Sequence, residues 1–478
     1  MTIVWADGDA VLIRPQGCPT CARRRRGDTE PARGVTLPFV RRAIDAIACG
    51  TTESVVRVDL RTARTTTHHV LPDPLCPDCA PPLSAHPKRI VLQPRKCTGL
   101  RVHELDRERL RATYVDACTG LVRSVRTTTA GGVPLAEAEL ASGRRAHGRT
   151  GDAESSWTTA IAEALERHGS SWPPRGQGLV RAAAADIEAF VPEPYPDDRY
   201  DLPGFPRRRF DPRREIDWVW GYSFGRGKPV LVPASVAYPD GAVEAFVQET
   251  SSGCAVGGCL EEAILHALLE IAERDAALRT WYGRQTVPRV DFNVDVPGYR
   301  VVVFDITQRQ GVPSFWTMAV DRTPSPVRWH TLCTTNAHLD PRQAIEGALV
   351  ELVTLLDVLP RTYDPVAAKR LLDDPRLVRE LPDHSLRYAH VDAFDRFSFL
   401  DLDADPVPLP DGWPPRADLT EHLTDLIDRF GEVVVVDQTS SEHRAADLCC
   451  VKVFVPEALP MTFGHDFRRH DGEPHPFP

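Results

Sequence analysis

Residues 251–282 read SSGCAVGGCLEEAILHALLEIAERDAALRTWY, a turn of small residues that leads into one long helical pattern. Four polar residues recur on one face of this helix at i, i+4, i+8 and i+11: Glu262, His266, Glu270 and Glu273. They span an arc of about 80°. The opposite face is apolar: Ile264, Leu265, Ala267, Leu268 and Ile271. For a single helix, this pattern most simply indicates a solvated acidic face above a stripe that packs on the core.

A second segment repeats the end of this pattern. Glu270-Ile-Ala-Glu273-Arg274 matches Glu163-Ala-Leu-Glu166-Arg167, and residues 156–168 around the earlier copy also form an amphipathic helical pattern. Two helices with the same E-x-x-E-R ending predict four carboxylates that converge on one cavity. Like charges repel one another unless cations neutralise them, and Mg²⁺ prefers carboxylate and phosphate oxygens. The repeat therefore predicts a site for magnesium and phosphate groups.

Length and charge restrict the class of protein. The chain has 478 residues, 42% of them apolar, which allows two or three domains with a large core. Its formal net charge of −10 argues against nucleic acid as the main partner. The sequence contains neither the P-loop motif G-x-x-x-x-G-K-[ST] nor an apolar run of ~18 residues that could span a membrane. Residues 1–10 lack the apolar core of a secretory signal, so we expect a cytoplasmic protein without a membrane partner.

Two C-P-x-C motifs near the N-terminus predict a metal site. They supply four thiols: Cys18, Cys21, Cys76 and Cys79. Two C-x-x-C pairs are typical of a closed, structural Zn²⁺ site without a free coordination position. The alternatives are redox-active or unpaired cysteines, or a zinc ribbon that binds nucleic acid, which the negative net charge disfavours.

Interleaved helical and strand patterns indicate an α+β or mixed α/β fold. Helices are expected at 38–49, 156–168, 340–359 and after the turn at 253–258 as far as residue 282, with Asp152 as a helix cap. Strands are expected at 54–60, 89–92, 114–126 (entered by a turn at 116–122), 301–305, 314–320, 433–437 and 450–455, with two more between 218 and 238. Residues 81–94 resemble a proline-rich linker. On composition alone, Pro474–Pro478 predicts a disordered or polyproline tail.

Several short motifs, taken in order, resemble the YcaO family. They are Thr119-Gly-Leu-Val, His147-Gly148-Arg149, AIAEALER at 160–167, residues 251–275, Ala337-His-Leu-Asp340 leading to Glu351-Leu, Val455-Pro456, Pro460-Met-Thr-Phe-Gly464 and the terminal P-x-P-x-P. The resemblance covers roughly residues 114–478 and implies a YcaO-type ATP-binding fold. The terminal P-x-P-x-P is typical of the azoline-forming cyclodehydratases in this family, and it replaces the interpretation of the tail as disordered.

The resemblance implies a reaction on the backbone of a ribosomally made precursor peptide. A Cys, Ser or Thr side chain of the substrate attacks the preceding carbonyl, and the resulting oxyanion takes the γ-phosphoryl group of ATP. Phosphate then leaves, and a thiazoline or oxazoline ring remains. Such chemistry requires a site that neutralises the triphosphate charge and aligns the peptide oxygen with the γ-phosphate.

By motif position, the resemblance implies that Mg²⁺ and ATP bind to four acidic residues: Glu163, Glu166, Glu270 and Glu273. It also implies nucleotide contacts from Arg149, Ser252 and His266, with Glu262 as a secondary candidate. Arg167 and Arg274 either contact phosphate or form structural ion pairs. His266 and the terminal carboxylate of Pro478 are the catalytic candidates.

The chain departs from the family pattern at five positions. Relatives often have G-K-G where Gly148-Arg149-Thr150 stands here, Asn at the positions of Ser252 and Gly258, and in some cases Arg at that of Gly347. Arginine can replace lysine as a phosphate cation, with different geometry. Because of these departures, individual ATP contacts known from relatives are not assured here, whereas all four carboxylates are present.

We expect three segments: a zinc-binding module at 1–90, a linker at 91–113 and a YcaO domain at 114–478. The first module resembles the zinc-binding end of E1-like (ThiF-like) partner proteins. We see no room for a leader-recognition domain before Cys18 and expect a separate E1-like partner to bind the precursor's leader peptide. Related enzymes suggest a homodimer. The sequence does not identify the precursor peptide, the number of rings or the preference between Cys and Ser/Thr.

Two alternative functions remain open. The same fold can form thioamides or macroamidines, although the proline tail argues against this. Alternatively, the chain is a non-catalytic, zinc-stabilised scaffold that binds peptide or nucleotide.

Overall fold

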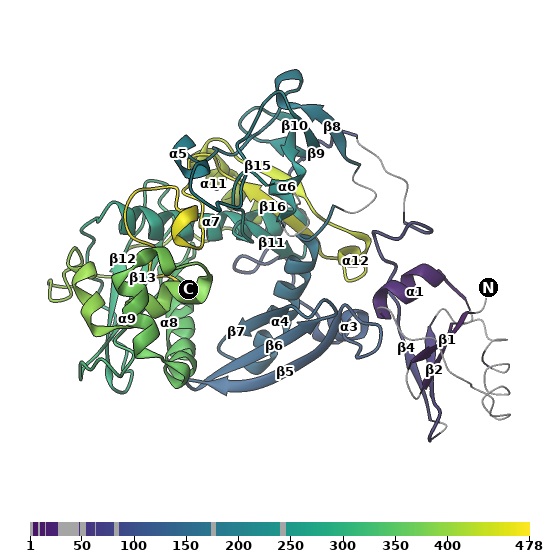
Figure 1. Ribbon diagram of the computed structural model, residues 1–478, viewed down its shortest axis with the longest axis horizontal. Coiled ribbons are helices and arrows are strands. Elements are labelled where there is room, and N and C mark those ends of the chain that lie inside the picture. Colours follow the sequence, from purple (N-terminus) through teal and green to yellow (C-terminus); the bar gives the residue numbers. More distant parts are fainter. Residues whose placement is uncertain are drawn as a thin grey trace.

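The computed structural model describes residues 3–7, 10–14, 16–26, 47, 54–62, 64–80, 86–173, 178–239 and 245–478. Antiparallel sheets and helices alternate along the chain, which confirms the predicted α+β class (Figure 1). No helix in these ranges is long and apolar enough to cross a membrane.

The N-terminal module is a four-stranded antiparallel sheet with one helix. The strand order is β1-β2-β3-β4: β1 (Ile3–Asp7), β2 (Ala10–Arg14), β3 (Val55–Asp59) and β4 (Thr65–His68). Helix α1 (Pro19–Arg26) follows β2 and begins directly after Cys18. Strand β3 confirms the strand predicted at 54–60, whereas the helix predicted at 38–49 lies outside the described residues except for Ile47. The module lies at one end of the molecule, beside α3 and α4 (Figure 1).

A three-stranded meander carries the first acidic helix. It consists of β5 (Val122–Ala130), β6 (Val133–Leu140) and β7 (Arg145–Arg149), and α4 (Ala153–Gly169) packs on β6 and β7. The apolar face of α4 is fully buried: Ala160, Ile161, Ala164 and Leu165. Asp152 caps the helix, as predicted, because its Oδ1 accepts hydrogen bonds from the backbone N–H groups of Glu154 (3.0 Å) and Ser155 (2.8 Å).

The second acidic helix lies against a six-stranded sheet. The order is β10-β9-β15-β16-β11, with β8 paired to β9: β8 (Val180–Ala183), β9 (Glu215–Ser223), β10 (Lys228–Pro233), β11 (Cys254–Gly257), β15 (Val434–Asp437) and β16 (Cys449–Phe454). Helix α7 (Leu260–Tyr282) covers β11 and β16 and packs beside α11 (Leu419–Phe430). The acidic residues Glu261, Glu262 and Glu273 are buried, so α7 does not present a solvated acidic face.

A third layer supplies the last wall of the site. It is the sheet β12 (Tyr299–Asp305), β13 (Ser314–Asp321) and β14 (Thr331–Ala337), against which α8 (Pro341–Val358) packs. The expected strands at 301–305 and 314–320 and the helix at 340–359 are confirmed. The remaining helices are α3 (Arg107–Tyr114), α5 (Asp197–Tyr200), α6 (Ala234–Ala237), α9 (Pro365–Asp373), α10 (Leu381–Tyr388) and α12 (Ser441–Arg444).

Two strand predictions were wrong. Residues 89–92 form no strand, and carboxylates bind the backbone that follows them: Gln93 N–H donates to Glu261 (2.8 Å) and Arg95 N–H to Asp418 (2.9 Å). Tyr114 ends α3 instead of starting a strand. The turn expected from Asp116 is present, and it leads into β5 only at Val122.

The C-terminal tail is part of the core. Phe477 is fully buried, with its ring 4.7 Å from that of Trp316, and His475 stacks on His384 at 4.2 Å. The Tyr388 hydroxyl donates to the carbonyl of Pro474 (2.5 Å). The disordered tail expected from composition alone is therefore wrong. His475 and Phe477 alternate with the prolines, and Phe477 is part of a buried hydrophobic cluster.

Candidate functional site

The two acidic helices meet at a cavity of about 430 Å³. Helix α4 contributes Glu163 and Glu166, and α7 contributes His266 and Glu270. The other walls come from β7, β11, β14 and α8: His147, Arg149, Cys254, Ala255, Val256, Asn336, Gly347, Val350 and Glu351. The structure thus brings three of the four repeated glutamates together in what we call the carboxylate cavity.

The carboxylate cavity concentrates negative charge. Burial, followed by the charges of Glu270 and Glu163, raises the pKa of Glu166 well above its usual range. Burial also raises the pKa of Glu270, against the opposing influence of Arg274 and of the Gly253 N–H, which donates to Glu270 at 3.0 Å. The carboxyl groups of Glu166 and Glu270 resist ionisation, so a bound cation would stabilise their ionised forms.

The fourth glutamate lies just behind the cavity wall. Glu273 accepts a hydrogen bond from Thr335 Oγ1 (2.8 Å) and pairs with Arg274 at 3.1 Å. Burial raises its pKa to about 7, although Arg274 and Thr335 act in the opposite direction. On the other helix, Arg167 pairs with Glu163 at 2.5 Å. Both arginines of the E-x-x-E-R motifs therefore form ion pairs with the motif acids.

The spacing of the carboxylates suits cations that also bind a phosphate ligand. Within the described ranges, only the four N-terminal cysteines bring three or more His, Cys, Asp or Glu ligand atoms within 4.8 Å of one another. The glutamates are too far apart to enclose one ion together. Mg²⁺ is usually held by one or two carboxylates, with phosphate oxygens and water completing its shell. The donor set therefore fits magnesium accompanied by a polyphosphate.

The remaining predicted residues divide between the cavity and its surroundings. His266 lines the cavity, and burial lowers its pKa to about 3, so its imidazole is neutral. Among the described residues its Nε2 has no hydrogen-bond partner, and it lies 3.9 Å from Glu262. Glu262 itself is not brought into the cavity, because its carboxylate binds the Val102 N–H (2.9 Å) and Arg101 (3.2 Å).

Arg149 lies in the cavity but is already paired. Its Nη1 donates to Glu351 at 2.8 Å. Opposite it, a Cβ built on Gly347 would lie 2.0 Å from Asn336 Nδ2, so Asn336 occupies the space of any side chain at this position. The departure at Gly347 is thus accompanied by an amide group that also lines the cavity. We did not predict Asn336, and the sequence offered only a weak signal for Glu351, within the α8 motif.

A buried lysine was missed entirely. Lys452 on β16 is 1% exposed, and its Nζ donates to the carbonyls of Thr250 (2.9 Å) and Ser252 (2.7 Å). Its charge acts on Glu166 and Glu270. Lys452 therefore fixes the loop before β11 and offsets part of the negative charge. Nothing in an alternating apolar strand distinguishes a lysine directed inward.

A second cavity of about 820 Å³ adjoins this region. Ser252, Arg274 and Lys452 line it, together with residues 190–197 and 453–461. Ser252 is thus placed in the neighbouring cavity. Pro478 is not among the residues that line either cavity. The start of the tail nevertheless lies against α7, since Trp281 Nε1 donates to the carbonyl of Glu473 at 3.1 Å.

The four N-terminal thiols form a compact cluster. Cys18 and Cys76 Sγ lie 3.6 Å apart, and Cys21 and Cys79 Sγ 3.2 Å apart. Tetrahedral Zn–S bonds of about 2.3 Å would separate sulfurs by about 3.8 Å, close to these distances. Burial opposes ionisation of Cys76, but the backbone N–H groups of Asp78 and Cys79 outweigh it and lower its pKa to about 7. The cluster can hold a metal ion.

Comparisons with known proteins agree with this architecture. An uncharacterized protein of Methanothermobacter thermautotrophicus is 28% identical over 218 residues, 41% of this chain and 52% of the relative. The chain spans about half the length of the curated relatives it matches.

Several solved structures share the fold, among them the following two. A heterocyclase in complex with substrate and cofactor matches with a TM-score of 0.75 and 19% identity, over 96% of this chain and 72% of that chain. YcaO from Methanopyrus kandleri, bound with AMPPCP and Mg²⁺, matches with a TM-score of 0.52 and 20% identity, over 70% and 86%. The family model described as YcaO cyclodehydratase, ATP- and Mg²⁺-binding, matches residues 147–459. These residues include α4, α7 and α8, and the chain belongs to the YcaO family.

Proposed function

We propose that this chain is an ATP-dependent cyclodehydratase that converts Cys, Ser or Thr residues of a ribosomally synthesised precursor peptide into thiazolines or oxazolines. The main support is the convergence of Glu163, Glu166 and Glu270 from two helices on one cavity. Their mutual repulsion makes a cation-bound polyphosphate the ligand that the site fits best. Membership of a family described as ATP- and Mg²⁺-binding supports the same ligand.

In this proposal, Glu163, Glu166 and Glu270 would hold Mg²⁺ from the cavity walls, with Glu273 behind the wall as the fourth predicted ligand, and the ion would neutralise the charge of the triphosphate. A substrate side chain adds to the preceding carbonyl, and the peptide oxygen takes the γ-phosphoryl group and leaves as phosphate. The net change is loss of one water per ring. His266, neutral at physiological pH, offers a hydrogen bond without adding charge, and Arg149 and Arg274 supply fixed positive charge beside the acids. Pro478 remains a catalytic candidate through its carboxylate.

The test combines the chain with a cognate precursor peptide, an E1-like partner, Mg²⁺ and ATP. We expect ATP hydrolysis coupled to a mass loss of one water per ring. In a parallel reaction with added sulfide, replacement of a backbone oxygen by sulfur would identify thioamide formation. Loss of a single water with a cross-linked backbone would identify a macroamidine. If both the peptide and the ATP stay unchanged, the non-catalytic scaffold is the function that fits.

The proposed partners are the precursor peptide, a separate E1-like protein that binds the leader, and a second copy of the chain. A structural relative, a heterocyclase, was solved with substrate and cofactor, which supports substrate binding by this fold. Use of ATP supports the cytoplasm as the site of action. The division into residues 1–90, 91–113 and 114–478 remains part of the proposal.

For the cysteine cluster, we propose a structural Zn²⁺ ion bound by Cys18, Cys21, Cys76 and Cys79. We expect about one equivalent of zinc in the purified protein, lost on replacement Cys76→Ser because three thiolates bind more weakly than four. Elemental analysis measures the content. Cys333→Ser is the matched control, since Cys333 lies on β14 and outside the cluster. Equal zinc contents in the two variants would contradict the assignment.

A further inference from the structure

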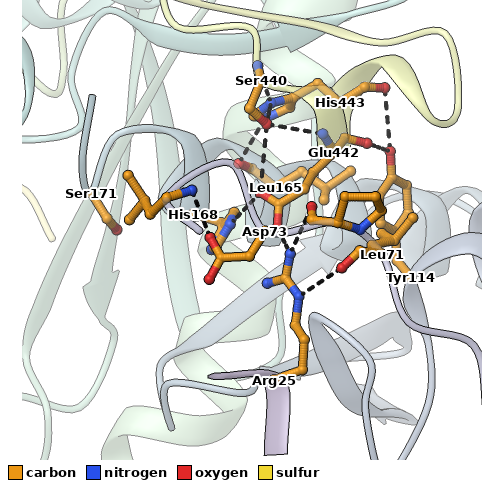
Figure 2. Close-up of polar contacts among 12 residues, drawn as sticks. Arg25, Leu71, Asp73, Tyr114, Leu165, His168, Ser171, Ser440, Glu442 and His443 are labelled. Carbon is orange, nitrogen blue, oxygen red and sulfur yellow. Dashed lines mark hydrogen bonds and ion pairs between the residues drawn. The ribbon is translucent and has the colours of Figure 1, made fainter. Parts of the chain in front are cut away.

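A buried ion pair joins the N-terminal module to the rest of the molecule (Figure 2). Arg25, on α1, directs its guanidinium at Glu442, on α12. Both side chains are almost completely buried, at 7% and 1% exposure. Arg25 also donates to the backbone carbonyls of Leu71 (3.3 Å) and Pro72 (3.4 Å). A charge pair this deep requires that both partners stay in place, because either one alone would be left unpaired in the interior.

Glu442 also contacts α4. Its second oxygen, Oε2, lies 2.7 Å from Nε2 of His168, in the last turn of α4. Burial lowers the pKa of His168 to about 3, so the ring is neutral and Nε2–H donates to the carboxylate. Arg25 and His168 thus bind the two oxygens of one carboxylate, and Figure 2 shows the three side chains meeting.

Neighbouring contacts fix α12 against the same helix end. His443 Nε2 lies 3.2 Å from the carbonyl of Leu165, and its Nδ1 lies 2.9 Å from Ser440 Oγ. The Tyr114 hydroxyl donates to the carbonyl of Glu442 at 2.7 Å. The C-terminal turn of α4 is therefore attached at His168 and at Leu165. Glu163 and Glu166 lie within two turns of these points.

We propose that the N-terminal module, with its cysteine cluster, positions the α4 glutamates of the carboxylate cavity. The Cys18–Cys21 pair secures α1, α1 presents Arg25, and the Arg25–Glu442 pair holds the end of α4 so that Glu163 and Glu166 point into the cavity. Arg25 is a positioning residue: it touches neither the cavity nor its ligand. The functional part of this inference rests on the proposed nucleotide site, whereas the structural part does not.

The experiment compares Arg25→Met with Arg24→Met in the full-length protein. Arg24 is the matched control because it is the adjacent arginine on α1, is 43% exposed and pairs with Asp73 within the module. Amide hydrogen exchange is measured over residues 160–170 and, as an internal reference, over α7. Titration with Mg²⁺–AMPPNP measures nucleotide affinity without peptide or turnover.

We expect Arg25→Met to speed exchange at residues 160–170 while α7 stays protected, and to weaken Mg²⁺–AMPPNP binding by about tenfold. Arg24→Met should change affinity less than about twofold, as expected for a partly exposed ion pair. Arg25→Lys keeps the charge and should fall between wild type and Arg25→Met. Unchanged exchange and affinity in Arg25→Met, or equal effects of both Met variants, would overturn the proposal.

Two further results separate the possible failures. Glu442→Gln removes the charge of the other partner, on α12, and leaves α1 unaltered. It must therefore speed amide exchange at residues 160–170 even if Arg25→Met folds poorly. Exchange protection like that of wild type would refute the positioning role. If the wild type binds no nucleotide but both variants loosen residues 160–170, the nucleotide site is wrong and the positioning of α4 stands.

Discussion

Replacing Glu270 by glutamine is expected to lower the rate of ATP-dependent ring formation by at least about 100-fold, the scale of losing one preorganised electrostatic contact. Glu270 is the α7 carboxylate that faces Glu163 and Glu166 across the cavity. Glutamine keeps the shape and the bond from the Gly253 N–H but removes the charge that a magnesium ion requires. Turnover is measured with the peptide and partner protein present.

The same change at Glu166 should separate function from stability. Burial and the acidic neighbours raise the pKa of Glu166 in the folded protein. Its contribution to folding is therefore favourable below the ordinary pKa of a glutamate, and it is lost as the pH rises from that pKa through the raised one. Glutamine removes this penalty, so we expect the metal-free variant to be more stable than wild type at neutral pH. Its melting temperature should no longer rise with Mg²⁺ and ATP.

Glu346→Gln is the control for both variants, because Glu346 is an exposed carboxylate on α8. It should behave as wild type in turnover and melting. Normal activity of Glu270→Gln and Glu166→Gln would show that this chain does not supply the ATP site and would favour a scaffold role.

The second large effect is expected at the C-terminal tail. Phe477→Ala should destabilise the protein by about 3–5 kcal/mol, since it removes a fully buried ring from a cluster with Trp316. Denaturant unfolding measures the loss. Val366→Ala, at a position 68% exposed on α9, is the control and should change stability little. A small effect at Phe477 would mean that the tail does not pack as described.

This packing changes what a tail deletion can prove. Removing Pro474–Pro478 should abolish activity, because it takes away Phe477, His475 and their contacts with Trp316 and His384. The same loss of core would impair a thioamide- or macroamidine-forming enzyme. Deletion therefore cannot separate these functions, and the mass of the peptide product must do so.

The fold was predictable where local patterns agreed with tertiary packing. The helix of residues 260–282 and the helix capped by Asp152 combine apolar periodicity with clear ends, and both were correctly expected. Residues 89–92 have the composition of a strand, but their neighbours are bound by carboxylates on α7 and α11. Such contacts join residues more than 150 positions apart, which a local pattern does not contain.

The site divides in the same way. The repeated E-x-x-E-R identified the helices whose glutamates meet, because helical periodicity places them on one face. Periodicity did not reveal that Glu262 pairs with Arg101. Glu262 and Glu273, eleven positions apart, lie on the same face of the helix, but a shared face does not mean a shared binding partner. Asn336 and Lys452 come from strands, where inward and outward positions alternate and a single polar residue gives no sign of its surroundings.

The burial of Lys452 has a practical consequence for chemical labelling. The chain contains only five lysines, and the other four, Lys88, Lys96, Lys228 and Lys369, are exposed or partly exposed. Lys452 is 1% exposed and its amine is hydrogen-bonded, so amine-reactive dyes or resins should attach at the outer four and spare the cation beside the acids. Immobilised or fluorescent forms of the protein can thus be prepared with the carboxylate cavity chemically intact.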